Sequence, residues 1–190
     1  MKVLREIGIT ILIAVVIFAL LRVTVQGYRV QYSSMLPSIE AGEWVMVTKA
    51  KYFFSHPERG DVIVFRHEGS EFPYIKRIIA LPGETVEIKD DKVFINGIAL
   101  EEEYVMEPPH YTMPPEEIPK DEYFVLGDNR NNSNDSHNGW TAPRDNISGK
   151  AWFVYWPPSR WGVVEHYSYP ELVGGNMQAA VLCNAVGGIT

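Results

Sequence analysis

The chain has 190 residues, enough for one compact domain together with a short additional segment. Its 46% hydrophobic and 22% charged residues are typical of a chain that folds around a core, which excludes a disordered protein. The first 30 residues carry a net charge of +3 and the remainder −10, so the domain lacks the basic surface that nucleic-acid binding requires.

An uncharged segment near the amino terminus predicts a membrane anchor. Residues 7–21 read IGITILIAVVIFALL, and apolar residues after Arg22 extend the run toward the roughly 20 residues that a membrane helix needs. A cleaved signal peptide would need small residues just downstream, and RVTVQGYRV has no A-x-A pattern. A buried amphipathic helix would be apolar on one face, whereas this run is apolar all round. We expect a tail at 1–5 and a transmembrane anchor at 6–25.

The charges beside this segment do not give its orientation. Lys2 and Arg5 precede the apolar run, while Arg22 and Arg29 follow it. The positive-inside rule counts both flanks, so the activity of the following domain must decide which side of the membrane that domain occupies.

Beyond residue 27 the pattern changes to that of strands, which predicts a mostly β domain over 27–170. The strand-like runs lie at 44–49, 61–66, 74–80, 123–127 and 151–156. TVEIK and KVFIN, joined through Asp90 and Asp91, predict a β-hairpin with a two-residue turn. Asn96 and Gly97 predict a second turn.

Three other features of this region lead to weaker expectations. The proline-rich stretch from Glu107 to Pro119 predicts an extended loop, because its fixed φ angles oppose a strand ladder. The small, glycine-dotted tail at 171–190 suggests no role. Four tryptophans are compatible either with an interfacial belt or with core packing: Trp140, Trp152, Trp156 and Trp161.

The metal-binding and redox residue types are sparse. The single cysteine, Cys183, excludes an intrachain disulfide and a cysteine-based metal site. The five histidines are scattered and lack the short spacings of a zinc site. We therefore expect neither a metal nor another cofactor.

Three sequence features together suggest a hydroxyl nucleophile with an amine base. They are SSMLP at 33–37, Lys76 within an apolar strand, and the loop GDNRNNSNDSHNGW at 127–140. Each alone has a simpler explanation, because serines before proline favour turns and a strand lysine usually points to solvent. A lysine that is desolvated in an apolar site, however, is neutral enough to take a proton from a serine.

The order of the motifs resembles the type I signal peptidases of bacteria. SSMLP is followed by RGDVIVF at 59–65, YIKRIIALPGE at 74–84 and GDNRNNSNDS at 127–136. These blocks run from the anchor to about residue 157, and the lysine in YIKR is the feature of the bacterial form. The resemblance implies a signal-peptidase-like β domain of antiparallel sheets behind one transmembrane helix.

The resemblance also implies a role for each motif residue. Ser34, directly before Met35, would be the nucleophile, and Lys76 the general base. Ser133 would hydrogen-bond and orient the lysine amine, and Asp135 would brace the site. The residues implied to form shallow substrate pockets are Met35, Tyr74 and Ile75.

Two positions depart from the family pattern. Two residues before the nucleophile, where the family tends to have a small or hydroxyl residue, this chain has Tyr32, which puts a side-chain contribution to the oxyanion in doubt. After the Asp-Ser pair, where the family usually has arginine, it has His137. A histidine makes the brace to Asp135 dependent on pH.

The implied activity is a membrane-bound serine endopeptidase that removes signal peptides from exported preproteins. Its implied location is the bacterial cell membrane, with a cytoplasmic amino terminus, an extracytoplasmic domain, and the lipid bilayer and protein translocation machinery as partners. The main alternative is a catalytically inactive, membrane-anchored β domain that binds peptides. A self-cleaving repressor of related fold would need a DNA-binding helical module at the amino terminus instead.

Overall fold

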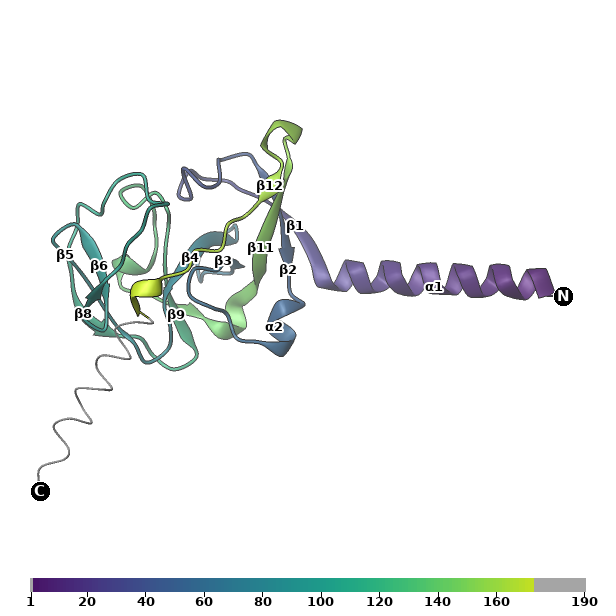
Figure 1. Ribbon diagram of the computed structural model, residues 1–190, viewed down its shortest axis with the longest axis horizontal. Coiled ribbons are helices and arrows are strands. Elements are labelled where there is room, and N and C mark those ends of the chain that lie inside the picture. Colours follow the sequence, from purple (N-terminus) through teal and green to yellow (C-terminus); the bar gives the residue numbers. More distant parts are fainter. Residues whose placement is uncertain (1, 173–190) are drawn as a thin grey trace, which may run out of the picture.

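The computed structural model describes residues 2–172, without the side chains of residues 2, 4, 20, 21 and 23. One long helix, α1 (Lys2–Thr24), points away from a β domain that holds the remaining elements (Figure 1). The tail expected at 171–190 lies almost entirely outside the described residues.

The helix α1 covers the segment for which the sequence predicts a membrane anchor. Its described apolar side chains, including Ile11, Leu12 and Phe18, are exposed. Across the described part of the chain, no helix combines the length and the apolarity needed to cross a membrane. The first strand begins at Val25, so the β domain starts one residue inside the predicted anchor.

The domain is mostly β, as predicted, and its paired strands are antiparallel throughout residues 2–172. The larger sheet has the order β1-β2-β11-β3-β4-β9-β10, and β12 pairs with β11. Its strands are β1 (Val25–Arg29), β2 (Trp44–Thr48), β3 (Val62–Phe65), β4 (Tyr74–Ala80), β9 (Glu122–Leu126), β10 (Ala142–Pro143), β11 (Ile147–Trp156) and β12 (Gly162–Val163). Near-continuous burial along β3 and β4 places both strands in the interior.

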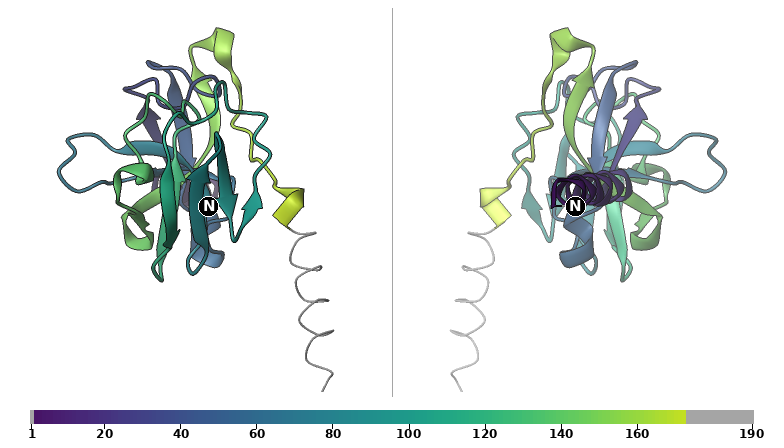
Figure 2. Two further views of the ribbon diagram at one scale, coloured as in Figure 1. Left: turned by 90° about the vertical axis from the view of Figure 1, so that its left-hand side faces the viewer. Right: turned by 90° about the vertical axis from the view of Figure 1, so that its right-hand side faces the viewer.

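The smaller sheet has the order β7-β6-β5-β8 and lies at the end of the domain opposite α1 (Figures 1 and 2). Its strands are β5 (Thr85–Lys89), β6 (Lys92–Ile95), β7 (Ile98–Ala99) and β8 (Met113–Glu117). The short helical segments are α2 (Lys51–Phe54) and the 3₁₀ turns η1 (Ser136–Asn138), η2 (Arg144–Asn146) and η3 (Pro158–Arg160).

The predicted hairpin is confirmed. Strands β5 and β6 pair with Lys89 opposite Lys92, and the two residues between them, Asp90 and Asp91, have φ angles of 49° and 59°. Positive φ at both central positions matches the right-handed twist of the strands. Asn96 and Gly97 form the second predicted turn in the same way, with φ angles of 51° and 81°.

The prediction of an irregular loop at residues 107–119 was wrong in part. Met113–Glu117 forms the strand β8, although it contains Pro114 and Pro115. β8 pairs only with β5 at the edge of its sheet, and the pairing register shifts between Val86 and Ile88. Proline is tolerated there because an edge strand needs hydrogen bonds on one side only and a register shift leaves residues unpaired.

The core supports the segment that follows β1. Met35 and Ile39 are completely buried and pack with residues of β2, β3 and β4. Their burial fixes the turn that carries Ser34 against the larger sheet.

The four tryptophans divide between the two alternatives. Trp140 packs against the core beside Phe65. Trp152, Trp156 and Trp161 are exposed on β11 and around η3, and the exposed fraction of Trp161 is 64%. Core packing therefore accounts for one tryptophan, and the other three remain available for an interface.

Candidate active site

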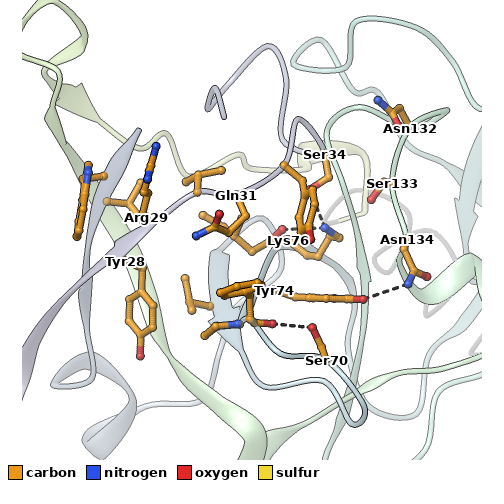
Figure 3. Close-up of a pocket in the computed structure, with 18 of the residues that line it drawn as sticks. Tyr28, Arg29, Gln31, Ser34, Ser70, Tyr74, Lys76, Asn132, Ser133 and Asn134 are labelled. Atoms are coloured by element: carbon orange, nitrogen blue, oxygen red, sulfur yellow. Dashed lines mark hydrogen bonds between the residues drawn. The ribbon is translucent and has the colours of Figure 1, made fainter. Parts of the chain in front are cut away.

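The turn after β1 and the strand β4 bring Ser34 and Lys76 together. Lys76 Nζ lies 2.7 Å from Ser34 Oγ and donates to the Ile75 carbonyl at 3.1 Å (Figure 3). The two side chains are 6% and 4% exposed, although 42 residues separate them in the chain. The lysine therefore points into the protein and not to solvent.

Burial lowers the pKa of Lys76 to about 8, because desolvation penalises the ammonium form. The charges of Asp135 and Asp128 act in the opposite direction and raise it. The amine is consequently neutral in a substantial fraction of molecules near pH 8. A neutral amine beside a serine hydroxyl is able to accept its proton.

The loop after β9 holds the serine turn from the opposite side. Asn129 N–H donates to the Ser34 carbonyl at 3.0 Å, and Asn129 Nδ2 donates to the Ser33 carbonyl at 3.1 Å. Gly127 makes this approach possible, because a Cβ there would lie 2.4 Å from both Ser34 O and Ser133 Oγ. The Ser34 carbonyl thus faces the loop.

The hydrogen bond expected between Ser133 and the lysine is absent. Ser133 Oγ is buried and has no hydrogen-bond partner among the residues described. Figure 3 places Ser133 in the same cleft, but the lysine amine is directed to Ser34 and to the Ile75 carbonyl. Ser133 therefore lines the cleft, but the hydrogen bond to the lysine that the sequence suggested does not form.

Asp135, at the end of this loop, contacts both Gly127 and His137. Its Oδ2 accepts from Gly127 N–H at 2.9 Å, and its Oδ1 lies 2.6 Å from His137 Nδ1. The carboxylate is completely buried, and the histidine ring stacks on Tyr111 with 4.1 Å between ring centroids. The contact on which a histidine brace depends is therefore present.

An ion pair that the sequence interpretation missed joins the three site segments. Arg77 donates to Asp128 through Nε at 2.9 Å and Nη2 at 2.7 Å, and Ser38 Oγ donates to the same carboxylate at 2.6 Å. Both members of the pair are buried. The available signal was an arginine directly after a lysine in an otherwise apolar strand. Adjacent strand residues face opposite sides of the sheet, so at least one of the two charges had to point inward.

A cleft of about 700 Å³ opens onto Ser34 and Lys76. One wall follows β1 and the residues after it, and the other follows residues 70–76 (Figure 3). Tyr74 and Ile75 line it as predicted, and Tyr74 Oη accepts from Asn134 Nδ2 at 3.1 Å. Tyr32 also lines the cleft and is 65% exposed.

Met35 does not line this cleft, contrary to the expectation that it forms a substrate pocket. Its side chain is completely buried in the core beneath the serine. Because Ser34 faces the cleft, the next side chain in the turn points inward. Met35 therefore supports the turn that carries Ser34 without lining the cleft.

One cluster in the described chain has the residue types of a cation site. Glu58, Asp61 and His166 have ligand atoms within 4.8 Å of one another, outside the cleft. Asp61 already pairs with the Lys150 ammonium and accepts from the Tyr52 hydroxyl at 2.8 Å. These partners satisfy the carboxylate, so the cluster is an ion-pair network and not a part of the cleft.

Known proteins resemble this chain over most of its length. The family model described as signal peptidase, peptidase S26, matches residues 4–156. A probable signal peptidase I-1 of Synechocystis sp. is 42% identical over 168 residues, which cover 84% of this chain and 86% of the relative. Signal peptidase I of Leptolyngbya laminosa is 40% identical over 85% of this chain and 82% of the relative, and signal peptidase I T of Bacillus subtilis is 38% identical over 80% and 85%.

Proposed function

The chain belongs to the signal peptidase family, peptidase S26, and is a serine peptidase that removes signal peptides, and on this premise we propose that Ser34 is its nucleophile and Lys76 its general base. The observation that carries the assignment is the distance of 2.7 Å between a buried amine and a buried hydroxyl at the end of a cleft. The lowered pKa of Lys76, which the same burial causes, is consistent with this role.

In the first half of the reaction, Ser34 Oγ attacks the carbonyl of the scissile bond and transfers its proton to Lys76. The oxyanion is held by the Ser34 N–H, which has no other hydrogen-bond partner within residues 2–172. The Lys76 ammonium then protonates the departing amine, the bond between carbonyl carbon and nitrogen breaks, and the signal peptide stays on Ser34 as an ester.

In the second half, a water molecule gives a proton to neutral Lys76 and attacks the ester. Collapse of this second tetrahedral intermediate returns the proton to Ser34 Oγ and releases the signal peptide. The same amine therefore serves as base twice. Asp135 supports it by holding Gly127 and by favouring the charged form that arises in each step.

The substrate class is a preprotein whose signal peptide enters the cleft in extended form. Tyr74 and Ile75 lie directly before the base and narrow the cleft, which suits alanine-sized side chains beside the scissile bond. Ser133 lines the same cleft, without a hydrogen bond to Lys76. Tyr32, largely exposed, is given no part in holding the oxyanion.

The direct test is incubation of the purified protein with a preprotein that carries an A-x-A cleavage site. We expect release of the signal peptide, and covalent modification of Ser34 by a serine-directed acylating lactam. A peptide-binding domain without catalysis would leave both molecules unchanged, and the relatives named as signal peptidases favour the enzyme.

His137 is proposed to make the brace to Asp135 dependent on pH. The pair lies 2.6 Å apart, and an arginine at this position would keep its charge at every pH, which histidine as a residue type does not. We expect His137→Arg to keep activity at neutral pH and to gain relative activity at alkaline pH, by at most about 5-fold. His137→Ala should lose activity at low pH.

The measurement is a pH–rate profile of the three proteins. Arginine is the informative substitution, because it keeps a charge at every pH used, whereas alanine removes it. If the three profiles superimpose after scaling, His137 has no part in the pH dependence.

We further propose that the segment 6–25 anchors the protein in the bacterial cell membrane, with a cytoplasmic amino terminus. The apolar sequence and the exposed apolar side chains of α1 support an anchor, and cleavage of exported preproteins requires the domain on the outer side. The lipid bilayer and the translocation machinery are the partners implied.

This topology predicts that protease added to intact spheroplasts digests the β domain. Alkaline carbonate should leave the protein in the membrane fraction, because an anchored protein does not dissociate with salt or pH. Full protection of the domain in cells shown to be intact would contradict the proposed orientation. Extraction of the protein by carbonate would contradict the proposed anchor.

A further inference from the structure

A second cleft, of about 470 Å³, lies beside β1 and outside the catalytic pair. Its walls come from β1, α2, η2 and the residues directly after β2 and β3, and they carry three cationic side chains: Lys49, Arg66 and Arg144. A single carboxylate, Asp145, lines it with them. The concavity is thus positively charged on a chain whose residues after position 30 have a net charge of −10.

Two of these cations have no ion-pair partner. Among the residues described, the side chains of Lys49 and Arg66 form neither a salt bridge nor a hydrogen bond. Arg144 donates to the Tyr52 carbonyl at 2.8 Å and covers the Tyr52 ring, which holds its guanidinium in the wall. The buried arginines of the described domain, by contrast, are paired, as Arg77 is with Asp128. The charges in this cleft are free for a ligand.

The cleft lies next to the point at which α1 enters the domain. Lys49 N–H donates to the carbonyl of Thr24, the last residue of α1, at 2.9 Å. The helix α2 lies close to this point (Figure 1). It carries Phe53, which lines the cleft, and Phe54, and their exposed fractions are 62% and 94%. Cations and exposed aromatic rings therefore occur together at the end of the helix.

We infer that this cleft binds the anionic phosphodiester headgroup of a membrane glycerophospholipid. Lys49, Arg66 and Arg144 contact the phosphate, while Phe53 and Phe54 lie among the acyl chains nearest the headgroup. The assignment to a lipid and not to a free phosphate depends on the two phenylalanines and on α1, and so rests on the proposed anchor. The site orients the domain on the membrane through a contact other than the helix.

The test measures lipid binding to the full chain released from nonionic detergent micelles, by native mass spectrometry. The probes are phosphatidylglycerol, phosphatidylcholine of equal chain length, and inorganic phosphate. We expect phosphatidylglycerol to bind at least about 10-fold more tightly than phosphatidylcholine, since each cation near an anionic lipid changes affinity roughly 5-fold. Inorganic phosphate should not displace the lipid at equal concentration.

The variant Lys49→Gln with Arg66→Gln should lose most of this preference, and it should fold, because neither side chain makes a hydrogen bond or ion pair with the described residues. The matched control is Lys92→Gln with Lys120→Gln, which removes the same charge from exposed positions outside the cleft. Equal affinity for both lipids, an unchanged preference in the cleft variant, or displacement by phosphate at equal concentration would each overturn the inference.

Cleavage of a preprotein in detergent distinguishes a failure of the lipid site from a failure of the proposed catalysis. Lys49 and Arg66 line neither the catalytic cleft nor its supporting loop, so the variant should cleave at the wild-type rate. Intact cleavage without a preference for phosphatidylglycerol rejects the headgroup site alone. Failure of the wild type to cleave rejects the proposed catalysis, whatever lipid is bound.

Discussion

Replacement of Ser34 by alanine should abolish removal of the signal peptide while the domain stays folded. The change deletes the hydroxyl that Lys76 meets at 2.7 Å, and no other group in the cleft takes its place. Loss of a serine nucleophile reduces turnover by at least about 10³-fold, with the remainder due to substrate binding and oxyanion contacts. Only one oxygen is removed, so the free energy of unfolding should change little. Cleavage of a preprotein and thermal unfolding measure the two effects.

Ser33→Ala is the matched control, since it removes the same group one residue earlier. The Ser33 hydroxyl accepts from Asn132 Nδ2 at 3.2 Å and does not contact the lysine. The variant should keep most of its activity. If the Ser34→Ala enzyme were active and the Ser33→Ala enzyme inactive, the assignment of Ser34 as nucleophile would be wrong.

Replacement of Lys76 by arginine should inactivate the enzyme as completely as replacement by alanine. A guanidinium does not deprotonate in a protein, so it cannot take a proton from Ser34 even though it keeps the positive charge of lysine. Lys76→Met is the control for stability, because it fills the same volume without a buried amine. Methionine should not destabilise the fold, since desolvation already penalises the lysine charge.

The same lysine determines the acidic limb of the pH–rate profile. In the proposed mechanism the neutral amine is the base, and the pKa of Lys76 is about 8. The value of kcat/KM should therefore rise as pH increases toward 8 and level off above it. A profile that is flat between pH 6 and 9, or measurable turnover by Lys76→Arg, would refute lysine as the base.

Strands with a plain apolar pattern could be predicted from the sequence, whereas those set by tertiary contacts could not. The β5–β6 hairpin follows from local turn chemistry at Asp90 and Asp91, which needs no distant partner. By contrast, β1 reads VQGYR, without a regular apolar alternation, and pairs only because β2 lies beside it. In β8 the prolines signal a loop, and only the edge position makes a strand compatible with them.

The proximity of Ser34 and Lys76 could be predicted because motif order indicates which residues belong together, but motif order carries no side-chain direction. Met35 was assigned to the cleft and lies in the core, and the expected hydrogen bond of Ser133 is absent. Arg77 and Asp128 were missed because a buried ion pair looks, in sequence, like two solvated charges. Three-dimensional burial distinguishes these cases.

The adjacency of Lys76 and Arg77 links catalytic competence to correct strand alignment. Side chains alternate across a strand, so β4 presents the amine to the serine and the guanidinium to Asp128 on the other side. A slip of β4 by one residue would exchange the two, leaving a permanently charged group beside Ser34 and a lysine that cannot form the two-pronged contact with Asp128. A misaligned molecule is therefore inert and not a peptidase of altered selectivity. With Lys76 as the proposed base, proteolysis would be confined to copies that have folded properly.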